Sequence, residues 1–135
     1  MRVLILHFLN KKNSKHANIL KNLEAAATNN GHQVTLIDAK DSDNLHFAMY
    51  EYIAVVTVSE KAFGAKLPPH MLEILSKHGS LSGIKGCSLV VKKGLSSEKM
   101  SRLAMHAMER EGMVIDYFQI IESADHAKAI GKKIG

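Results

Sequence analysis

The chain has 135 residues, enough to bury a hydrophobic core of its own, so we expect a single domain over residues 1–135. Hydrophobic residues make up 46% and charged residues 23%, which excludes a disordered chain. The formal net charge is +5, but the cations are spread along the chain, no basic run exceeds two residues and no aromatic residues are interleaved with them. We therefore expect no nucleic-acid partner.

Cys87 is the only cysteine, so the chain can form neither an internal disulfide nor a cysteine-based zinc site. It begins an apolar segment over residues 87–91, which favours a buried core residue over a nucleophile. This cysteine usage suits a reducing compartment, and we expect a cytoplasmic protein. No apolar stretch approaches the length of a membrane span, so no membrane partner is expected.

The pattern of apolar residues predicts five strands, each followed by a helical segment. The strands are expected at about residues 2–8, 33–37, 52–58, 87–91 and 113–121, all rich in aliphatic or β-branched side chains. The helical segments are expected at about residues 15–30, 45–50, 69–77, 97–111 and after residue 123. Such alternation predicts an α/β fold in which helices cover both faces of a parallel sheet.

Several residues mark where the helices begin and end. Asn13 or Ser14 can cap the first helix, and Gly31 suits the left-handed position after its last turn. Ser96 is expected to cap the helix that follows it. In the segment 69–77 the apolar side chains predicted to face the core are Met71, Leu72 and Leu75.

Right-handed crossovers leave few ways to arrange five such units. The number of strands favours a three-layer, doubly wound parallel sheet in the order 2-1-3-4-5. In that order the loops after the first, third and fourth strands meet at the carboxyl edge of the sheet, where such folds bind ligands. These loops are residues 10–15, 59–67 and 92–96.

The first of these loops has the composition of an anion site. It places two amides, a hydroxyl and three amines at the start of a helix, in the side chains of Asn10, Lys11, Lys12, Asn13, Ser14 and Lys15. Free backbone amides and the helix dipole favour a phosphate dianion, and the amines add positive charge. The alternative is that Asn13 and Ser14 only cap the helix.

Several activities found on similar folds lack their required residues here. A response regulator needs carboxylates at the end of the first strand, where this chain has His7 and Phe8, of which His7 could touch a ligand. A low-molecular-weight phosphatase or a sugar phosphocarrier needs a cysteine in the first loop, and the Rossmann GxGxxG and Walker GxxxxGK[ST] motifs are absent. The eight histidines form no H-E-x-x-H pattern, so we predict neither a metal site nor catalytic residues.

Five segments resemble the flavodoxin-like family, particularly its small NAD(P)H-dependent FMN reductases. Residues 11–14, Lys-Lys-Asn-Ser, resemble the S-x-R-x-x-S/T phosphate loop of those reductases. The other similar segments are residues 50–56, which lead into the third strand, and residues 63–69, 81–86 and 111–113, which lead into later elements. Their order extends over most of the chain.

The resemblance implies an FMN site at the carboxyl edge. The backbone amides of residues 12–15 and the hydroxyl of Ser14 would hold the phosphate, and Lys93 with Gly94 would bound the far side of the isoalloxazine. The near side would be lined by Ser59, Phe63 and Gly64, with Phe63 stacking on the ring. The implied function is electron transfer, or NAD(P)H-linked flavin reduction, with a redox protein as partner.

The chain also departs from this family. The first loop has no glycine, the second lacks both the P-x-Y of the reductases and the T-x-x-G of flavodoxins, and the net charge is positive where flavodoxins are acidic. A second hypothesis is therefore a domain that has lost FMN and serves as an interaction or small-anion-binding module. No residue indicates a nicotinamide site, which leaves enzyme activity open. Small doubly wound proteins often pair through a helical face, which allows a homodimer.

Overall fold

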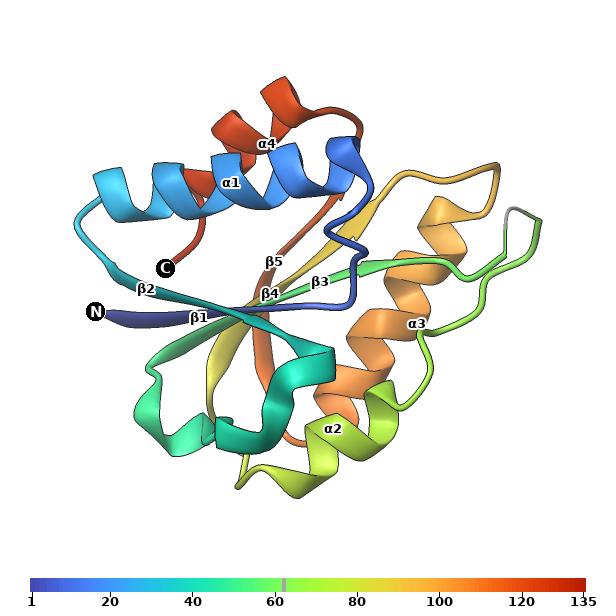
Figure 1. Ribbon diagram of the computed structural model, residues 1–135. Coiled ribbons are helices and arrows are strands. Elements are labelled where there is room, and N and C mark those ends of the chain that lie inside the picture. The colour runs from blue at the N-terminus through green and yellow to red at the C-terminus, as the bar shows by residue number, and fades with distance from the viewer. Residues whose placement is uncertain (62) are drawn as a thin grey trace.

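Within residues 1–61 and 63–135, which the computed structural model describes, five parallel strands form one sheet (Figure 1). Their spatial order is β2-β1-β3-β4-β5, as predicted. The strands are β1 (Arg2–His7), β2 (Gln33–Asp38), β3 (Tyr52–Val58), β4 (Lys85–Val91) and β5 (Val114–Ile121). The predicted three-layer fold class is thereby confirmed.

Helices cover both faces of this sheet, as Figure 1 shows. One face carries α1 (Ser14–Asn29) and α4 (Ala124–Gly131), and the other carries α2 (Met71–Lys77) and α3 (Ser97–Arg110). Two short 3₁₀ segments, η1 (Ala39–Asn44) and η2 (Phe47–Met49), connect β2 to β3. Parallel strands require such crossover connections, because each new strand must start again at the same edge.

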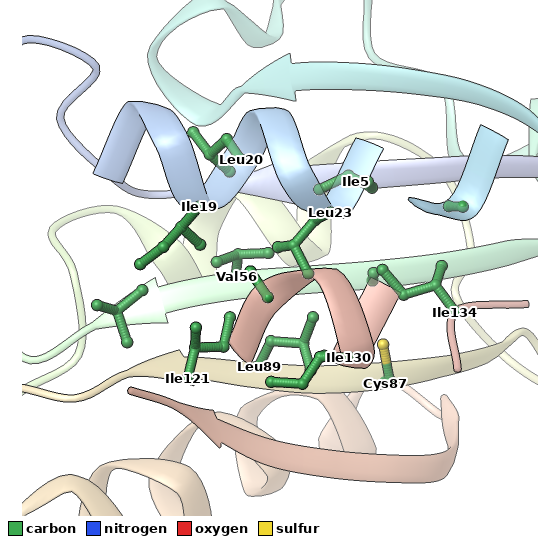
Figure 2. Close-up of a cluster of buried hydrophobic side chains, with 14 of the residues drawn as sticks. Ile5, Ile19, Leu20, Leu23, Val56, Cys87, Leu89, Ile121, Ile130 and Ile134 are labelled. Atoms are coloured by element: carbon green, nitrogen blue, oxygen red, sulfur yellow. The ribbon is translucent and has the colours of Figure 1, made fainter. Parts of the chain in front are cut away.

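The face under α1 and α4 is a continuous apolar layer (Figure 2). Strand residues Ile5, Val56 and Leu89 pack in one cluster with helix residues Leu23 and Ile130, and all five are almost fully buried. Burying an aliphatic side chain of this size contributes about 1.5–3 kcal/mol relative to exposure. Cys87 lies in the same layer and has no exposed surface, so its predicted role as a core residue is confirmed.

The structure corrects the prediction of a helix over residues 45–50. Leu45 and His46 have extended backbones, with φ/ψ of −82°/123° and −134°/106°, and only Phe47–Met49 make a single 3₁₀ turn. The physical reason is burial: Leu45 and Phe47 both enter the core while His46 between them is exposed. Alternation with a period of two needs an extended chain there.

Leu72 was wrongly expected to face the core, since 52% of its side chain is exposed. Helix α2 begins at Met71 and has seven residues, and it buries Met71 and Leu75, which are four apart. Residues one position apart point about 100° away from each other around a helix axis. Leu72 therefore faces outward once Met71 faces inward.

The start and end of α1 follow the predicted signals. The Asn13 side chain, and not that of Ser14, accepts hydrogen bonds from the amides of Lys15 at 3.0 Å and His16 at 3.2 Å. Gly31 has a φ of +93°, the left-handed conformation that residues with a side chain rarely adopt. These two residues fix where the first loop ends and therefore which groups it presents at the carboxyl edge.

Candidate functional site

A cavity of about 500 Å³ opens at the carboxyl edge of the sheet. It extends from the first turn of α1 to the segment that leads into α2, and Asp38 and Val58, at the ends of β2 and β3, also line it. Its polar lining comes from Asn10, Asn13, His16, Asp38, Lys40, Glu60, His70 and Lys93. Phe8, Pro69 and Ile74 are among its apolar lining residues. The volume lies within the usual range for small-molecule sites.

The first loop is closed by its own two asparagines. The Asn10 side chain accepts a hydrogen bond from the Lys12 amide at 3.0 Å, and the Asn10 carbonyl accepts one from the Asn13 amide at 3.0 Å. Asn13 in turn accepts from the amides of Lys15 and His16. A phosphate can reach these amides only if the asparagine side chains give way.

His16 lines this cavity from the first turn of α1. Its Nδ1 atom is buried and has no partner within the described ranges, 1–61 and 63–135. Burial lowers the pKa of His16, and the charges of Lys15 and Lys93 lower it further. The effect of Lys93 means that the loop after β4 brings positive charge to the first turn of α1. This positive charge favours an anion, and the carboxylates of Asp38 and Glu60 on the same lining oppose one.

His7 lies at the end of β1, and its side chain has no exposed surface. Its Nδ1 atom accepts a hydrogen bond from the Leu9 amide at 3.3 Å, and its Nε2 atom has no partner in the part of the chain that the structure describes. Burial lowers the pKa of His7, the charge of Asp38 on β2 opposes this shift, and the charge of Lys11 adds to it. The ring sits beneath the edge of the sheet and does not line the cavity.

Ser59 organises the loop that follows β3. Its side chain is buried, and its hydroxyl accepts hydrogen bonds from the amides of Lys61 and Lys66, both at 3.2 Å, while donating to the Lys61 carbonyl at 2.8 Å. The Glu60 amide also donates to the Lys66 carbonyl at 3.1 Å. These bonds hold the two ends of the loop close together. Phe63 lies between them in sequence, and 77% of its side chain is exposed.

The loop after β4 is held to the loop after β3. The Gly64 amide donates to the Ser96 hydroxyl at 2.9 Å, and the Lys93 amide donates to the Ser97 hydroxyl at 3.2 Å. Ser96 was expected to cap α3 with its side chain, but it makes no such bond and serves the neighbouring loop instead. Gly94 occupies the left-handed region with a φ of +64°.

The three predicted loops do meet at one edge, although not all of their residues reach the cavity. Asn10, Asn13 and Lys93 line it. The others lie outside its lining: Lys11, Lys12, Ser14, Lys15, Ser59, Phe63, Gly64 and Gly94. All of these except Ser59 are exposed.

The sequence did not predict Asp38 and His70, which line the cavity on the side of β2 and α2. Asp38 is the last residue of β2. Its position at the carboxyl end of a predicted strand could have identified it from the sequence as a residue of the ligand-binding edge. His70 has a φ of +64°, the only non-glycine residue with a positive φ in the described chain. Nothing in the sequence marks that conformation, which is costly for residues other than glycine and asparagine.

The described residues hold neither a metal-binding cluster nor a membrane-spanning helix. No group of three His, Cys, Asp or Glu side chains is placed to share a metal ion. None of the helices in the ranges 1–61 and 63–135 combines the length and the apolar character that crossing a membrane requires.

Neither a protein-family model nor a curated protein sequence matches this chain. Solved structures of flavodoxins do match it. An archaeal flavodoxin superposes with a TM-score of 0.76 at 17% identity, covering 99% of this chain and 96% of that one. The two-electron reduced flavodoxin of Megasphaera elsdenii gives 0.76 at 17% identity, covering 96% of each chain. A C101S mutant of the Pseudomonas aeruginosa flavodoxin gives 0.71 at 14%, covering 98% and 95%.

Proposed function

We propose, starting from the flavodoxin-like fold of this chain, that it binds a phosphate-bearing ligand at the carboxyl edge of its sheet. FMN is the first candidate, and electron transfer or NAD(P)H-linked flavin reduction is the corresponding function. The observation that carries the proposal is the cavity of about 500 Å³ at which α1 begins and to which Lys93 adds its charge.

The lining offers a phosphate the amines of Lys40 and Lys93, and it also carries the carboxylates of Asp38 and Glu60. His16, Lys93 and Asn13 line it from two loops, and the buried Nδ1 atom of His16 has no hydrogen-bond partner among the described residues. An anion placed among them would raise the lowered pKa of His16 and let its ring donate a hydrogen bond. The residues present therefore fit the phosphate end of FMN.

The ring end of FMN would occupy the space between the loops after β3 and β4. Ser59, Phe63 and Gly64 would lie on one side of the isoalloxazine, and Lys93 with Gly94 on the other. FMN would supply the redox chemistry, while the chain would orient the ring and set the charge around it. Phe63 is exposed and free to stack, but the Gly64–Ser96 hydrogen bond must break before a ring can enter.

That same hydrogen bond favours a second function, a flavin-free domain that binds a small anion or a partner. The two loops are already joined, and the asparagines already occupy four amides of the first loop, those of Lys12, Asn13, Lys15 and His16. In this case the cavity would take a phosphorylated ligand without a flat ring system.

Titration with FMN, riboflavin and inorganic phosphate separates the two functions. Binding of FMN but not riboflavin, followed by flavin fluorescence, supports the first, and binding of phosphate alone supports the second. Lys93→Ala should weaken either ligand about tenfold, which corresponds to the loss of one charge-assisted hydrogen bond. Lys85→Ala, at the opposite edge of the sheet, is the matched control. Unchanged affinity in Lys93→Ala would place the ligand elsewhere.

A further inference from the structure

At the carboxyl edge the loops after β1, β3 and β4 are basic, whereas residues 38–44 after β2 and residues 122–125 after β5 each carry a net charge of −2. The loops over residues 10–15, 59–66 and 92–96 contain seven lysines and one carboxylate, that of Glu60. Their net charge of +6 exceeds the +5 of the whole chain, so the remaining residues are close to neutral. All seven lysines are exposed, and only Lys92 pairs with a carboxylate, Glu122, at 3.6 Å within the described residues.

Two apolar side chains project from the same edge. Phe63 is 77% exposed and Leu95 is 87% exposed, the highest values among the large apolar side chains that the structure describes. They come from different loops, but each directly precedes a partner in the Gly64–Ser96 hydrogen bond. That bond of 2.9 Å holds the two loop tips together. We call Phe63 and Leu95 the double tip.

Buried or half-buried serines hold the double tip in place. The Ser59 hydroxyl closes the base of one loop, the Ser97 hydroxyl receives the Lys93 amide at the base of the other, and Ser96 joins the two. In Figure 1 both loops extend beyond the ends of β3 and β4. The exposed apolar groups are thus presented by a supported scaffold, which marks them as a candidate interaction site.

The composition of this edge favours a lipid surface over a protein or a nucleic acid. Every cation on the three loops is a lysine and none is an arginine. Lysine is depleted in protein interfaces, and arginine is preferred for recognition of carboxylates and nucleic acids. Lysines surrounding a projecting phenylalanine and leucine instead resemble the composition of surfaces that bind anionic membranes.

We propose that this edge docks on an anionic lipid surface. The double tip enters the boundary between head groups and acyl chains, and the surrounding lysines contact the lipid phosphates and carboxylates. The sequence led us to expect no membrane partner, because no apolar stretch is long enough to span a bilayer, but a surface contact of this kind needs no spanning segment. It shares Phe63 and Lys93 with the proposed FMN site, whereas Leu95, Lys61 and Lys66 belong to the docking edge alone.

The test is co-sedimentation of the full chain, without added flavin, with vesicles of phosphatidylcholine alone or mixed with phosphatidylserine. We expect binding to the mixed vesicles only, weakening as salt is raised. Replacing Lys61 and Lys66 together by Glu should reduce partition at least about 25-fold, since each lysine near an anionic surface contributes about fivefold. Leu95→Ser should reduce it about tenfold at unchanged charge.

Matched controls use the same changes elsewhere on the surface. Replacing Lys132 and Lys133 together by Glu changes the net charge by the same amount as replacing Lys61 and Lys66. Phe118→Ser removes an exposed aromatic ring from β5. Both should retain binding, and thermal unfolding verifies that each variant is folded. No binding to anionic vesicles at low salt would overturn the proposal. Full competition by poly-L-glutamate with no effect of Leu95→Ser would also overturn it, in favour of an acidic protein partner.

Discussion

The backbone amide of Gly64 donates a hydrogen bond to the hydroxyl of Ser96 across two loops that are 32 residues apart in sequence. The bond joins the loop after β3 to the loop after β4. In the proposed FMN complex the flavin ring would lie between these two loops. The bond also brings the double tip together, so one hydrogen bond bears on both proposals.

Ser96→Ala removes the acceptor of this bond and should let the loops separate. We expect FMN to bind up to about tenfold more tightly, since the net contribution of an exposed hydrogen bond is about 0.5–1.5 kcal/mol. Flavin fluorescence measures the affinity, and Ser76→Ala on α2 is the control. An affinity that stays the same or falls would mean that this bond does not obstruct the ring.

Asn13→Ala should destabilise the fold by about 1 kcal/mol, the usual cost of losing a side-chain cap at a helix N-terminus. Two amides, those of Lys15 and His16, lose their acceptor in this variant. Urea unfolding measures the loss, and Asn13→Ser, which keeps a capping oxygen, should recover most of it. Added inorganic phosphate should stabilise Asn13→Ala more than the wild type if the freed amides bind an anion. Equal stabilisation of both would argue against a phosphate at this position.

The stability of the protein should depend on pH through His7. Because burial lowers the pKa of His7 in the folded chain, the unfolded chain binds a proton more readily below the ordinary value of 6.5. The free energy of unfolding should therefore be at its full value above about pH 6.5 and fall as pH decreases through the lowered pKa. His7→Gln cannot titrate and should show a shallower decline in a series of urea unfolding curves. An identical decline would assign the pH dependence to other groups.

Cys87 should be inert in the folded protein. Burial raises the pKa of its thiol to about 12, so almost no thiolate exists near neutral pH. A chromogenic disulfide reagent should leave the native protein unmodified and label one thiol per chain in urea. Rapid labelling under native conditions would mean that β4 opens far more often than its burial implies.

Patterns of neighbouring residues were sufficient for most of the secondary structure. The apolar run over residues 52–58 predicted β3 with its observed bounds, and Gly31 predicted the end of α1. The errors came where a local pattern allowed two outcomes. Leu72 fits an inward stripe until the packing of Met71 fixes the rotation of α2, and residues 45–50 fit a helix until Leu45 and Phe47 both need to be buried.

The candidate site could be predicted only in part. The sequence identified the three loops and the residues Asn10, Asn13 and Lys93 that line the cavity. It could not indicate the unusual backbone of His70, because that conformation depends on how the chain enters α2. It also could not reveal that Ser96 bonds to Gly64 and not to its own helix, since the two loops meet only after β3 and β4 have paired.

By itself, the sequence determined the fold class, because alternating apolar strands and amphipathic helices can bury their surfaces only as a covered parallel sheet. Only the tertiary structure decided where the charge lies. Along the chain the lysines are spread singly and in pairs, and they indicate no partner. Parallel strands bring the loops after β1, β3 and β4 to one edge, so seven lysines that are distant in sequence lie at the same end of the sheet.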